Sequence, residues 1–436
     1  VMELVELEKE RYDDFVRNNP YKSHFLQSLA WGELAQEKRH LTPYFLGLVD
    51  ENNEIQAATL LLKKTLPLKL CYFYAPRGYV LDFHNESILE EFTKKIIAFA
   101  KKHKAIYVKI DPDIIWQREK YDGTIIEEEK KEQKIFQHLK KLGYRHLGFT
   151  KNFETMQPRY TFRIDLNQSM KEIESHFSKT TKQRINKSLK LKTKVEIGTE
   201  KDLKEFYHLM MLTEDRKDFV SYPLDYYETL YRLFNRKDKA ILFLGKVNMD
   251  EMLKVEEEEK EALEAKKREF PQENLSKSAK NKLKDLDRQL EKITKDITYH
   301  QEIKKEYGND ITLSAHMIVE YGNKAWVLYA GNHNILTDTY TNYHTYLEHL
   351  TYCKNEGLKI YDQFGTIGDL SKENPRLGLH EFKKKFGGDY IEFMGEFDYV
   401  LKPIYYFAFT KLVPIYRNLI KKRKKKELKN EVQRVK

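Results

Sequence analysis

The order of strand and helix patterns in the first half of the chain recurs in the second half. This internal duplication restricts the fold more than any other feature of the sequence. The first copy predicts a strand at 44–50, a turn at 51–54, a strand at 55–64, an extended segment at 70–83, a helix at 88–100 and a strand at 105–113. The second copy predicts, in the same order, a strand at 240–248, an extended segment at 311–332, a helix at 343–353 and a strand at 358–365. The chain is therefore expected to build two related units.

Each unit predicts a mixed, largely antiparallel sheet flanked by helices. The expected fold class is therefore α/β, or α+β, built twice, with a cleft between the two units available to a ligand. The length of 436 residues and the mass of 52.3 kDa exceed the usual size of one hydrophobic core. Length alone thus also favours two or three domains.

The second copy differs from the first by a long insertion at 248–309, placed where the first copy has only its turn. Apolar residues recur there at spacings of three and four, as in a coiled coil: Ala279, Leu283, Leu286, Leu290, Ile293 and Ile297. The segment 249–270 is the expected antiparallel partner helix, joined through 271–274. At about 1.5 Å per residue, such an arm would project by roughly 35–40 Å. It could be a solvated spacer, a dimer element or a surface for RNA.

The net charge of +10 favours a polyanionic partner, such as RNA, a phosphate-bearing substrate or an anionic membrane, although many basic proteins bind none of these. Two segments concentrate the charge. At 179–194, Lys179, Lys182, Arg184 and Lys187 follow helical spacing and suit the phosphates of RNA, or simply a solvated helix face. At 412–436, an amphipathic stretch becomes strongly basic, which is typical of a tail on anionic lipid or RNA and equally of a frayed terminus.

The cysteine content indicates a reducing compartment, and the absence of long apolar runs gives no sign of a signal peptide or a membrane span. Cys71 and Cys353 lie far apart in apolar or helical segments, so we expect two buried thiols, with no disulfide framework and no metal site. The segment 1–17 lacks the apolar stretch of a secretory signal, and no run approaches about 18 apolar residues. The expected location is cytoplasmic.

A series of short motifs, spread over nearly the whole chain, resembles a known family. They are SHFLQSLAWGEL (23–34), RGYVLD (77–82), YVKIDPD (107–113), QPRYTFRIDL (157–166), YGNKAWVLYAGN (321–332), FKKKFGG (382–388) and GEFDYVLKPIYY (395–406). In this order they resemble the FemA, FemB and FemX aminoacyltransferases of Gram-positive bacteria, which extend the interpeptide bridge of peptidoglycan. The inserted arm resembles that of the long, FemA- and FemB-like members.

The resemblance implies two tandem acetyltransferase-like (GNAT-like) subdomains. The first would cover 1–152, and the second would cover 153–247 and 310–395, with the arm at 248–309. The segment 396–436 would return to the first subdomain and carry the basic tail. The implied partners are an aminoacyl-tRNA donor and a lipid-linked or nucleotide-linked peptidoglycan precursor as acceptor. Contact with the inner face of the membrane, and association with related Fem proteins or with a second copy, are further implied possibilities, and no cofactor is implied.

In the implied reaction an amine attacks an ester that is already activated, so neither a protein nucleophile nor a metal is needed. The resemblance places Lys383 and Phe382 near the reacting ends, where Lys383 would support negative charge. Asp111 follows a predicted strand and precedes a proline, a position equally suited to an acid/base carboxylate and to a structural turn.

The acceptor side of the site would come from segments that match the family's precursor-binding surface. The substrate-binding residues expected there are Trp31, Tyr74, Arg77, Tyr222, Tyr226 and Tyr329, together with Glu396, which is also a second candidate carboxylate beside Asp111. Arg77 suits a phosphate, or an exposed turn. Some relatives have a basic residue where this chain has Tyr222, and another just after the tryptophan matched by Trp31. These departures favour an acceptor held elsewhere, such as lipid II at the membrane.

Two other functions are consistent with the same scaffold. One is a non-catalytic protein that binds tRNA or a membrane. The other is an acetyl-CoA-dependent acyltransferase, which needs a pyrophosphate-binding loop between strand and helix that neither half contains. The donated amino acid, with glycine, serine and alanine usual in the family, is left open. The overall resemblance favours extension of the bridge over its initiation.

Overall fold

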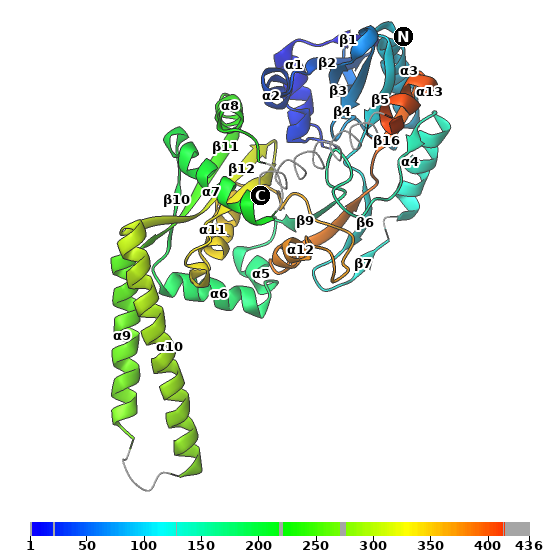
Figure 1. The fold of residues 1–436 in the computed structure, drawn as a ribbon. Coiled ribbons are helices and arrows are strands. Elements are labelled where there is room, and N and C mark those ends of the chain that lie inside the picture. Colours follow the sequence, from blue (N-terminus) through cyan, green and yellow to red (C-terminus); the bar gives the residue numbers. More distant parts are fainter. Residues whose placement is uncertain are drawn as a thin grey trace, which may run out of the picture.

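The computed structural model describes residues 2–20, 22–127, 129–217, 221–270, 276–412 and 414. Two mixed sheets lie side by side, each covered by helices, and a long helical hairpin extends from the second sheet (Figure 1). The fold class expected from the sequence, α/β built on two units with an inserted arm, is confirmed.

The first sheet has seven strands, in the order β1-β2-β3-β4-β5-β16-β8. In that order they are β1 (Glu3–Glu6), β2 (Thr42–Val49), β3 (Ile55–Thr65), β4 (Cys71–Ala75), β5 (Ala105–Ile110), β16 (Phe397–Val400) and β8 (Arg145–His146). All neighbours are antiparallel except β4 and β5, which are parallel and joined through the helix α3 (Glu86–Lys102).

The second sheet has nine strands, in the order β10-β11-β12-β13-β14-β9-β15-β6-β7. In that order they are β10 (Lys194–Ile197), β11 (Lys239–Asn248), β12 (Asp310–Tyr321), β13 (Lys324–Asn332), β14 (Ile360–Asp362), β9 (Tyr160–Asp165), β15 (Asp389–Phe393), β6 (Ile115–Glu119) and β7 (Ile125–Ile126). The parallel pair here is β13 and β14, joined through α11 (Thr341–Asn355). The predicted repeat is thus present: β2-β3-β4-α3-β5 corresponds to β11-β12-β13-α11-β14.

Helices pack on the faces of both sheets. The others outside the arm are α1 (Lys9–Arg17), α2 (Leu29–Arg39), α4 (Glu129–Lys141), α5 (Met170–Ser175), α6 (Lys179–Lys190), α7 (Leu203–Lys217), α8 (Leu224–Phe234), α12 (Leu377–Lys384) and α13 (Pro403–Phe407). Short helical turns are η1 (Phe25–Gln27), η2 (Pro67–Lys69), η3 (Glu200–Asp202), η4 (Thr337–Thr339) and the π-helical η5 (Ala408–Leu412). Ser28 caps α2 and Ser178 caps α6, each accepting a backbone N–H of the first turn.

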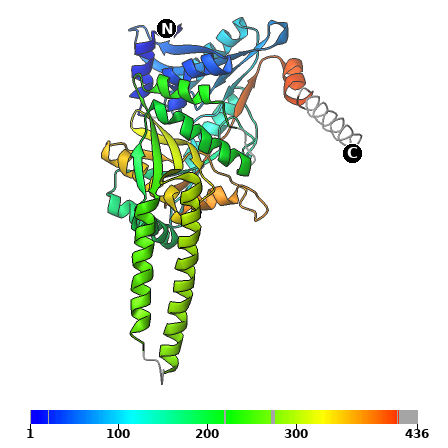
Figure 2. The ribbon, with the colours of Figure 1, turned by 60° about the vertical axis from the view of Figure 1, so that its left-hand side comes forward.

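The arm consists of α9 (Met249–Arg268) and α10 (Lys277–Tyr307), which run antiparallel away from the second sheet (Figure 2). The six predicted seam residues of α10 are all partly or fully buried, whereas most of its other positions are exposed. On α9 the buried positions along the arm are Met252, Leu253, Glu256 and Leu263. A polar pair, Glu256 and His300, therefore occupies one layer of the seam.

Two strand pairings differ from a simple division of the chain into successive subdomains. The hairpin β6–β7 falls within 1–152, which the sequence assigned to the first subdomain, yet β6 pairs with β15 in the second sheet. The reverse occurs at the end of the chain, where β16 pairs with β5 of the first sheet. Each half of the chain thus contributes a strand to the sheet of the other unit.

A shared hydrophobic core lies where the units meet. It contains buried residues from the first unit, such as Phe25 and Leu60, together with residues from the second, such as Leu242 and Trp326. The ring centroids of Phe25 and Trp326 are 5.0 Å apart. Both cysteines are buried and free, as predicted. Among the described residues, no helix is both long and apolar enough to cross a membrane.

Candidate functional site

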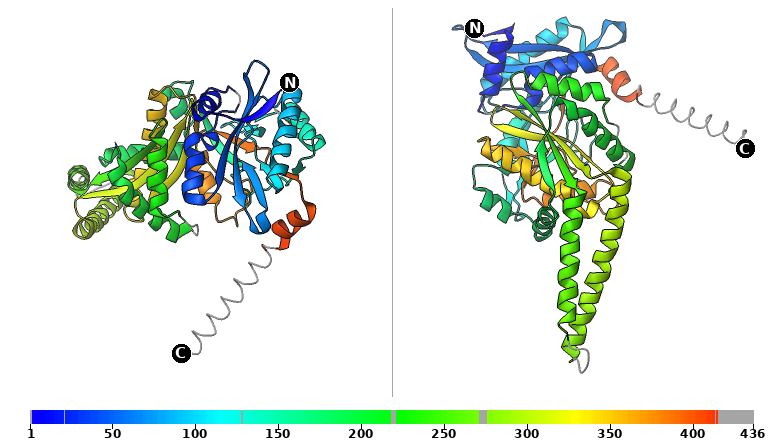
Figure 3. Two further views of the ribbon diagram at one scale, coloured as in Figure 1. Left: turned by 90° about the horizontal axis from the view of Figure 1, so that it is seen from above. Right: turned by 90° about the vertical axis from the view of Figure 1, so that its left-hand side faces the viewer.

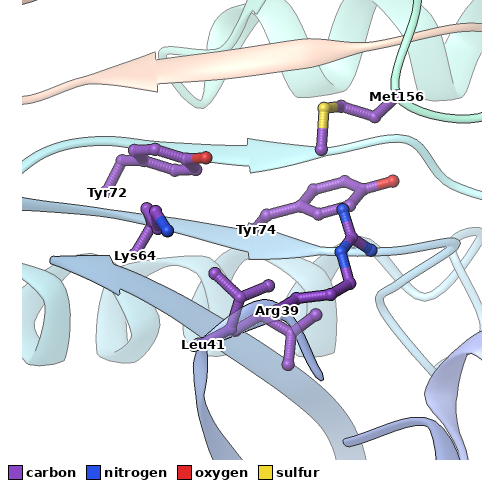
Figure 4. A pocket seen from close by; sticks show the side chains of 7 residues that line it. Arg39, Leu41, Lys64, Tyr72, Tyr74 and Met156 are labelled. Carbon is purple, nitrogen blue, oxygen red and sulfur yellow. The ribbon is translucent and has the colours of Figure 1, made fainter. Parts of the chain in front are cut away.

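A pocket of about 210 Å³ opens on the first unit, between the end of α2 and strands β3 and β4 (Figure 4). Its lining residues are Arg39, Leu41, Leu62, Lys64, Tyr72, Tyr74 and Met156. The charged side-chain groups of Arg39 and Lys64 make no hydrogen bond or ion pair with another described residue. Burial raises the pKa of Tyr72 above its ordinary value, and the positive charge of Arg39 partly opposes this rise. Two unpaired cations in a pocket are suited to an anionic group.

Asp111 lies behind this pocket, just after β5 ends. Its carboxylate accepts a hydrogen bond from the Tyr74 hydroxyl at 2.8 Å and another from the backbone N–H of Arg77 at 2.7 Å. Burial raises the pKa of Asp111 to about 7, against the lowering effect of the Arg77 charge. A carboxyl group with this pKa can gain and lose a proton near neutral pH, as a general base requires. Tyr74 connects it to the pocket.

Glu396 lies in the same neighbourhood and is held by two partners. Its carboxylate pairs with the Lys109 ammonium at 3.1 Å and accepts the backbone N–H of Met156 at 2.6 Å. Lys109 also pairs with Asp398 at 2.9 Å. Since its carboxylate already binds a cation and an amide, Glu396 fixes the segment that carries Met156 over the pocket.

The side chain of Arg77 is buried, so it does not have the exposed-turn position that was one of its two expected readings. Its guanidinium donates to the carbonyl oxygen of Pro158 at 2.6 Å and stacks on the ring of Phe393, 4.2 Å from its centroid. It does not lie in an exposed turn, and it is not among the residues that line the pocket. Its Nε is buried and has no hydrogen-bond partner among the described residues. Its structural effect is to join β4 and Asp111 to the second sheet.

Lys383, on α12, is also buried and directed at backbone. Its ammonium donates to the carbonyl oxygens of Gln363 at 2.7 Å, Gly365 at 2.6 Å and Phe364. These three bonds order the loop that follows β14. Phe382 packs against Tyr343 and Tyr346, with ring centroids 5.0 and 4.9 Å apart.

The loop ordered by Lys383 adjoins the Asp111 neighbourhood. At Gly365, whose φ is +73°, an added Cβ would lie 3.1 Å from the ring of Pro158, whose carbonyl binds Arg77. The structure thus links Asp111, Arg77 and Lys383 through one chain of contacts, although they are distant in sequence.

Three of the four predicted tyrosines form a cluster. Tyr222 stacks on Tyr226 with centroids 3.9 Å apart, and the hydroxyls of Tyr226 and Tyr329 lie 3.2 Å apart. Burial raises the pKa of Tyr226 well above its ordinary value, and the positive charge of Arg39 is one of the smaller effects that oppose this rise. The cluster and the pocket therefore share one cation. Tyr222 is exposed, whereas Tyr226 is buried.

Trp31, which was expected to bind substrate, is not among the residues that line this pocket. It is buried in the shared core on α2 and makes an edge contact with Phe25, with centroids 5.6 Å apart. Its indole ring stabilises the junction of the two units.

The four cations predicted to bind RNA lie on α6, near the base of the arm. Lys179 and Lys182 are exposed, and Lys182 donates to the Ser175 carbonyl at 3.0 Å. Arg184 binds the hydroxyl of Tyr343, and Lys187 pairs with Asp338 at 3.2 Å. Only part of this predicted face is thus directed at solvent.

Arg39 and Lys64 were missed by sequence analysis, although they line the pocket. Arg39 ends α2, where cations are common because they balance the helix dipole, so it carried no functional signal. Lys64 stands beside Lys63 in a strand pattern, and only the pairing of β3 shows which of the two faces the pocket.

The geometry provides an anion site beside a buried carboxyl group that titrates near neutral pH, connected by a tyrosine hydroxyl. This arrangement suits transfer of an acyl group to an amine, which needs an oriented substrate and a proton acceptor. Together with the two-unit α/β fold, it defines the protein as a transferase.

Comparison with known proteins identifies the family. The model of the FemAB family matches residues 7–413. The lipid II:glycine glycyltransferase of Staphylococcus epidermidis is 30% identical over 420 residues, which cover 95% of this chain and 96% of the relative. The lipid II:glycine glycyltransferase of Staphylococcus aureus strain MRSA252 is 31% identical over 420 residues, covering 93% and 94%. A crystal structure of FemX has a TM-score of 0.73 at 28% identity, covering 93% of this chain and 98% of that chain. The chain belongs to the FemAB family, as the motifs predicted.

Proposed function

We propose that the protein transfers an amino acid, glycine in the first instance, from an aminoacyl-tRNA to the peptide bridge of lipid II. The observation that carries this proposal is the pocket in which Arg39 and Lys64 are unpaired beside the Tyr74–Asp111 pair. The lipid-linked acceptor and the glycyl group are taken from the names of relatives that match along nearly the whole chain. The tRNA donor rests on the resemblance alone.

The proposed reaction forms one bond and breaks one. The neutral bridge amine attacks the ester carbonyl, the C–N bond forms, and the C–O bond to the ribose breaks. The amine must lose a proton and the ribose oxygen must gain one. Tyr74 accepts the amine proton as it gives its own to Asp111, 2.8 Å away, and the ribose oxygen receives a proton by the reverse route. Since the pKa of Asp111 is about 7, both transfers are accessible at neutral pH.

The acceptor is held by its phosphates. Arg39 can bind a diphosphate oxygen through two N–H groups, and Lys64 supplies a second charge across the pocket. This assignment replaces the role expected for Arg77, whose guanidinium is already bound to Pro158. The tyrosine cluster of Tyr226 and Tyr329 extends the same surface.

The donor approaches from the side of α6 and α12. We assign Lys383 a positioning role, because its ammonium holds the loop 363–365 against Pro158. The exposed Lys179 and Lys182 are suited to phosphates of the tRNA backbone.

The proposal is tested by a direct assay of transfer. The protein is incubated with tRNA charged with glycine, serine or alanine, and with lipid II that carries zero, one or three bridge residues. Mass spectrometry of the lipid products then measures the added mass. We expect a glycine increment on one of these acceptors. No increment with any charged tRNA, while a lipid II:glycine glycyltransferase is active in parallel, would refute the proposal and favour the non-catalytic alternative.

A further inference from the structure

The C-terminal helical segment carries an exposed apolar surface that the transfer reaction does not use. It is formed by α13 and η5 together with the η2 loop, and its large side chains are Leu68, Ile404, Tyr405, Phe407 and Leu412, here called the α13 surface. Leu68 is 79% exposed, Ile404 84% and Phe407 58%. Large apolar side chains gathered at this exposure mark an interaction surface.

The two segments are held together by a small core beneath them. Tyr406 packs on Tyr107 with centroids 5.3 Å apart, and Phe409 packs on Tyr72 at 5.7 Å. Leu66 and Leu70, which flank the exposed Leu68, pack against the same cluster. The Tyr406 hydroxyl also donates to Asp398 of β16 at 2.7 Å. The exposed side chains are therefore presented on a fixed base.

The charge of the α13 surface is uniformly positive along these segments. Within 66–70 and 401–412 the charged residues are Lys69, Lys402 and Lys411, with no acidic residue among them. A pocket of about 460 Å³ lies beside them, lined by Arg145 and Lys411, with the buried Asp398 as its only described carboxylate. The sequence that follows η5 is rich in lysine and arginine. This combination complements an anionic, partly apolar layer.

The position of the surface connects it to the acceptor pocket. Tyr72 lines that pocket on one side and packs on Phe409 of η5 on the other. The arm leaves the second unit at a distance from α13, as the right view of Figure 3 shows. If α13 rests on a bilayer, the pocket lies beside the membrane.

We propose that the α13 surface docks the protein on an anionic lipid bilayer, with Leu68, Ile404 and Phe407 inserted among the lipids and the lysines on their headgroups. This inference deepens the proposed function, because a lipid-linked acceptor lies in such a bilayer. Docking needs neither donor nor acceptor, however, so it can be measured separately from transfer.

The test is sedimentation of the full chain with vesicles. One set contains phosphatidylcholine alone, and the other contains phosphatidylcholine with phosphatidylglycerol. The variants are Ile404→Ser with Phe407→Ser, and Leu68→Ser alone. Ile197→Ser is the matched control, because it is 58% exposed on β10, outside the α13 surface. We expect the parent to favour the anionic vesicles, and the double variant to lose roughly tenfold or more in partitioning. The control should bind like the parent.

Several outcomes would overturn the inference. The double variant and Leu68→Ser could bind as well as the parent, with all binding lost in high salt, which would assign binding to charge alone. The parent could also fail to bind and elute as a dimer that the double variant dissociates, which would assign the surface to a second copy. Leu68→Ser lies on a separate loop, so it still reports on docking if the double variant perturbs α13. Transfer without docking would remove only this inference, and docking without transfer would remove only the proposed function.

Discussion

At the scale of single residues, Asp111 combines the features of a proton acceptor. It is buried, accepts two hydrogen bonds and is joined to the pocket through Tyr74. Arg39 and Lys64 complement it, since their side chains are cations in the same pocket that pair with no other described residue. Arg77 and Lys383, which were also predicted, donate to backbone carbonyls and hold the segments around the site in place.

The first prediction concerns Asp111→Asn. If Asp111 accepts the proton, kcat should fall by roughly 100- to 10,000-fold. In the parent, activity should rise as the pH passes about 7, where the carboxyl ionises. Tyr74→Phe removes a hydrogen bond that lowers the pKa of Asp111. The pH profile of the activity that remains should therefore have its midpoint at a higher pH than in the parent. Rates measured across pH decide this, and an Asp111→Asn profile identical to the parent's would exclude the role.

Stability gives an independent check on the same group. The folded pKa of Asp111, about 7, lies above its unfolded value, so the unfolded chain loses the proton first. This group therefore stabilises the fold fully only below the unfolded pKa, and its contribution declines as the pH rises toward 7. Asp111→Asn should flatten the dependence of Tm on pH in that range, as measured by thermal melts.

The second prediction separates Lys64 from its neighbour. Lys64→Gln and Arg39→Gln should each raise the KM for the lipid-linked acceptor by roughly tenfold, because each removes a charge from the phosphate site. Lys63→Gln is the matched control, since successive side chains of a strand point to opposite faces. An equal rise in KM for Lys63→Gln would indicate a general effect of net charge.

At the scale of elements, the arm is attached through a buried polar clamp. His300 of α10 binds Glu256 of α9 through Nδ1 at 2.8 Å, and its Nε2 lies 3.8 Å from Asp338. Asp338 in turn pairs with Lys187 of α6. Apolar contacts of Met249, Met252 and Ile303 with the second sheet complete the attachment. The arm is thus fixed to the same region as the basic helix α6.

The third prediction follows from the titration of this clamp. Burial opposes the charge on His300, but the hydrogen bonds to Asp338 and Glu256 raise its pKa to about 9. A raised histidine pKa stabilises the fold fully below its unfolded pKa of about 6.5, and the contribution is lost as the pH rises through about 9. The parent should lose Tm over this range. The His300→Gln variant should have a lower Tm than the parent at pH 6.5 and should lose less of it as the pH rises to about 9. An equal dependence of Tm on pH in the two proteins would exclude this contribution of His300.

At the scale of the whole molecule, one core joins the two units. Phe25 contacts Trp31, Phe234 and Trp326, which come from both halves of the chain. The exchange of β16 and β6–β7 between the sheets ties the units further. The molecule should therefore unfold cooperatively, although its sequence is duplicated.

The fourth prediction tests this coupling. Phe25→Ala should destabilise the protein by about 3–5 kcal/mol, because it empties a buried site at the junction. Phe73→Ala removes a ring that is equally buried but belongs to the core of the first unit alone. Both variants should show one shifted transition in denaturant, followed by circular dichroism and tryptophan fluorescence. Two separate transitions, only one of them moved by Phe73→Ala, would show that the units unfold independently.

The sequence by itself determined the repeated order of elements, the place and antiparallel form of the arm, and the family. These follow from local periodicity and short motifs, which neighbouring residues encode. It also placed Asp111 at the end of a strand, where the structure finds it.

Only the tertiary structure decided which residues meet. It buried Trp31 and Arg77, bound Lys383 to three carbonyls, and placed Arg39 and Lys64 in one pocket, where neither side chain pairs with another residue that the structure describes. It also paired β6 and β16 with the sheet of the other unit. The physical reason is that burial, pairing and free charge depend on contacts between segments that local sequence patterns do not relate. A helix-ending arginine or a strand lysine carries the same local pattern whether it faces solvent or a substrate.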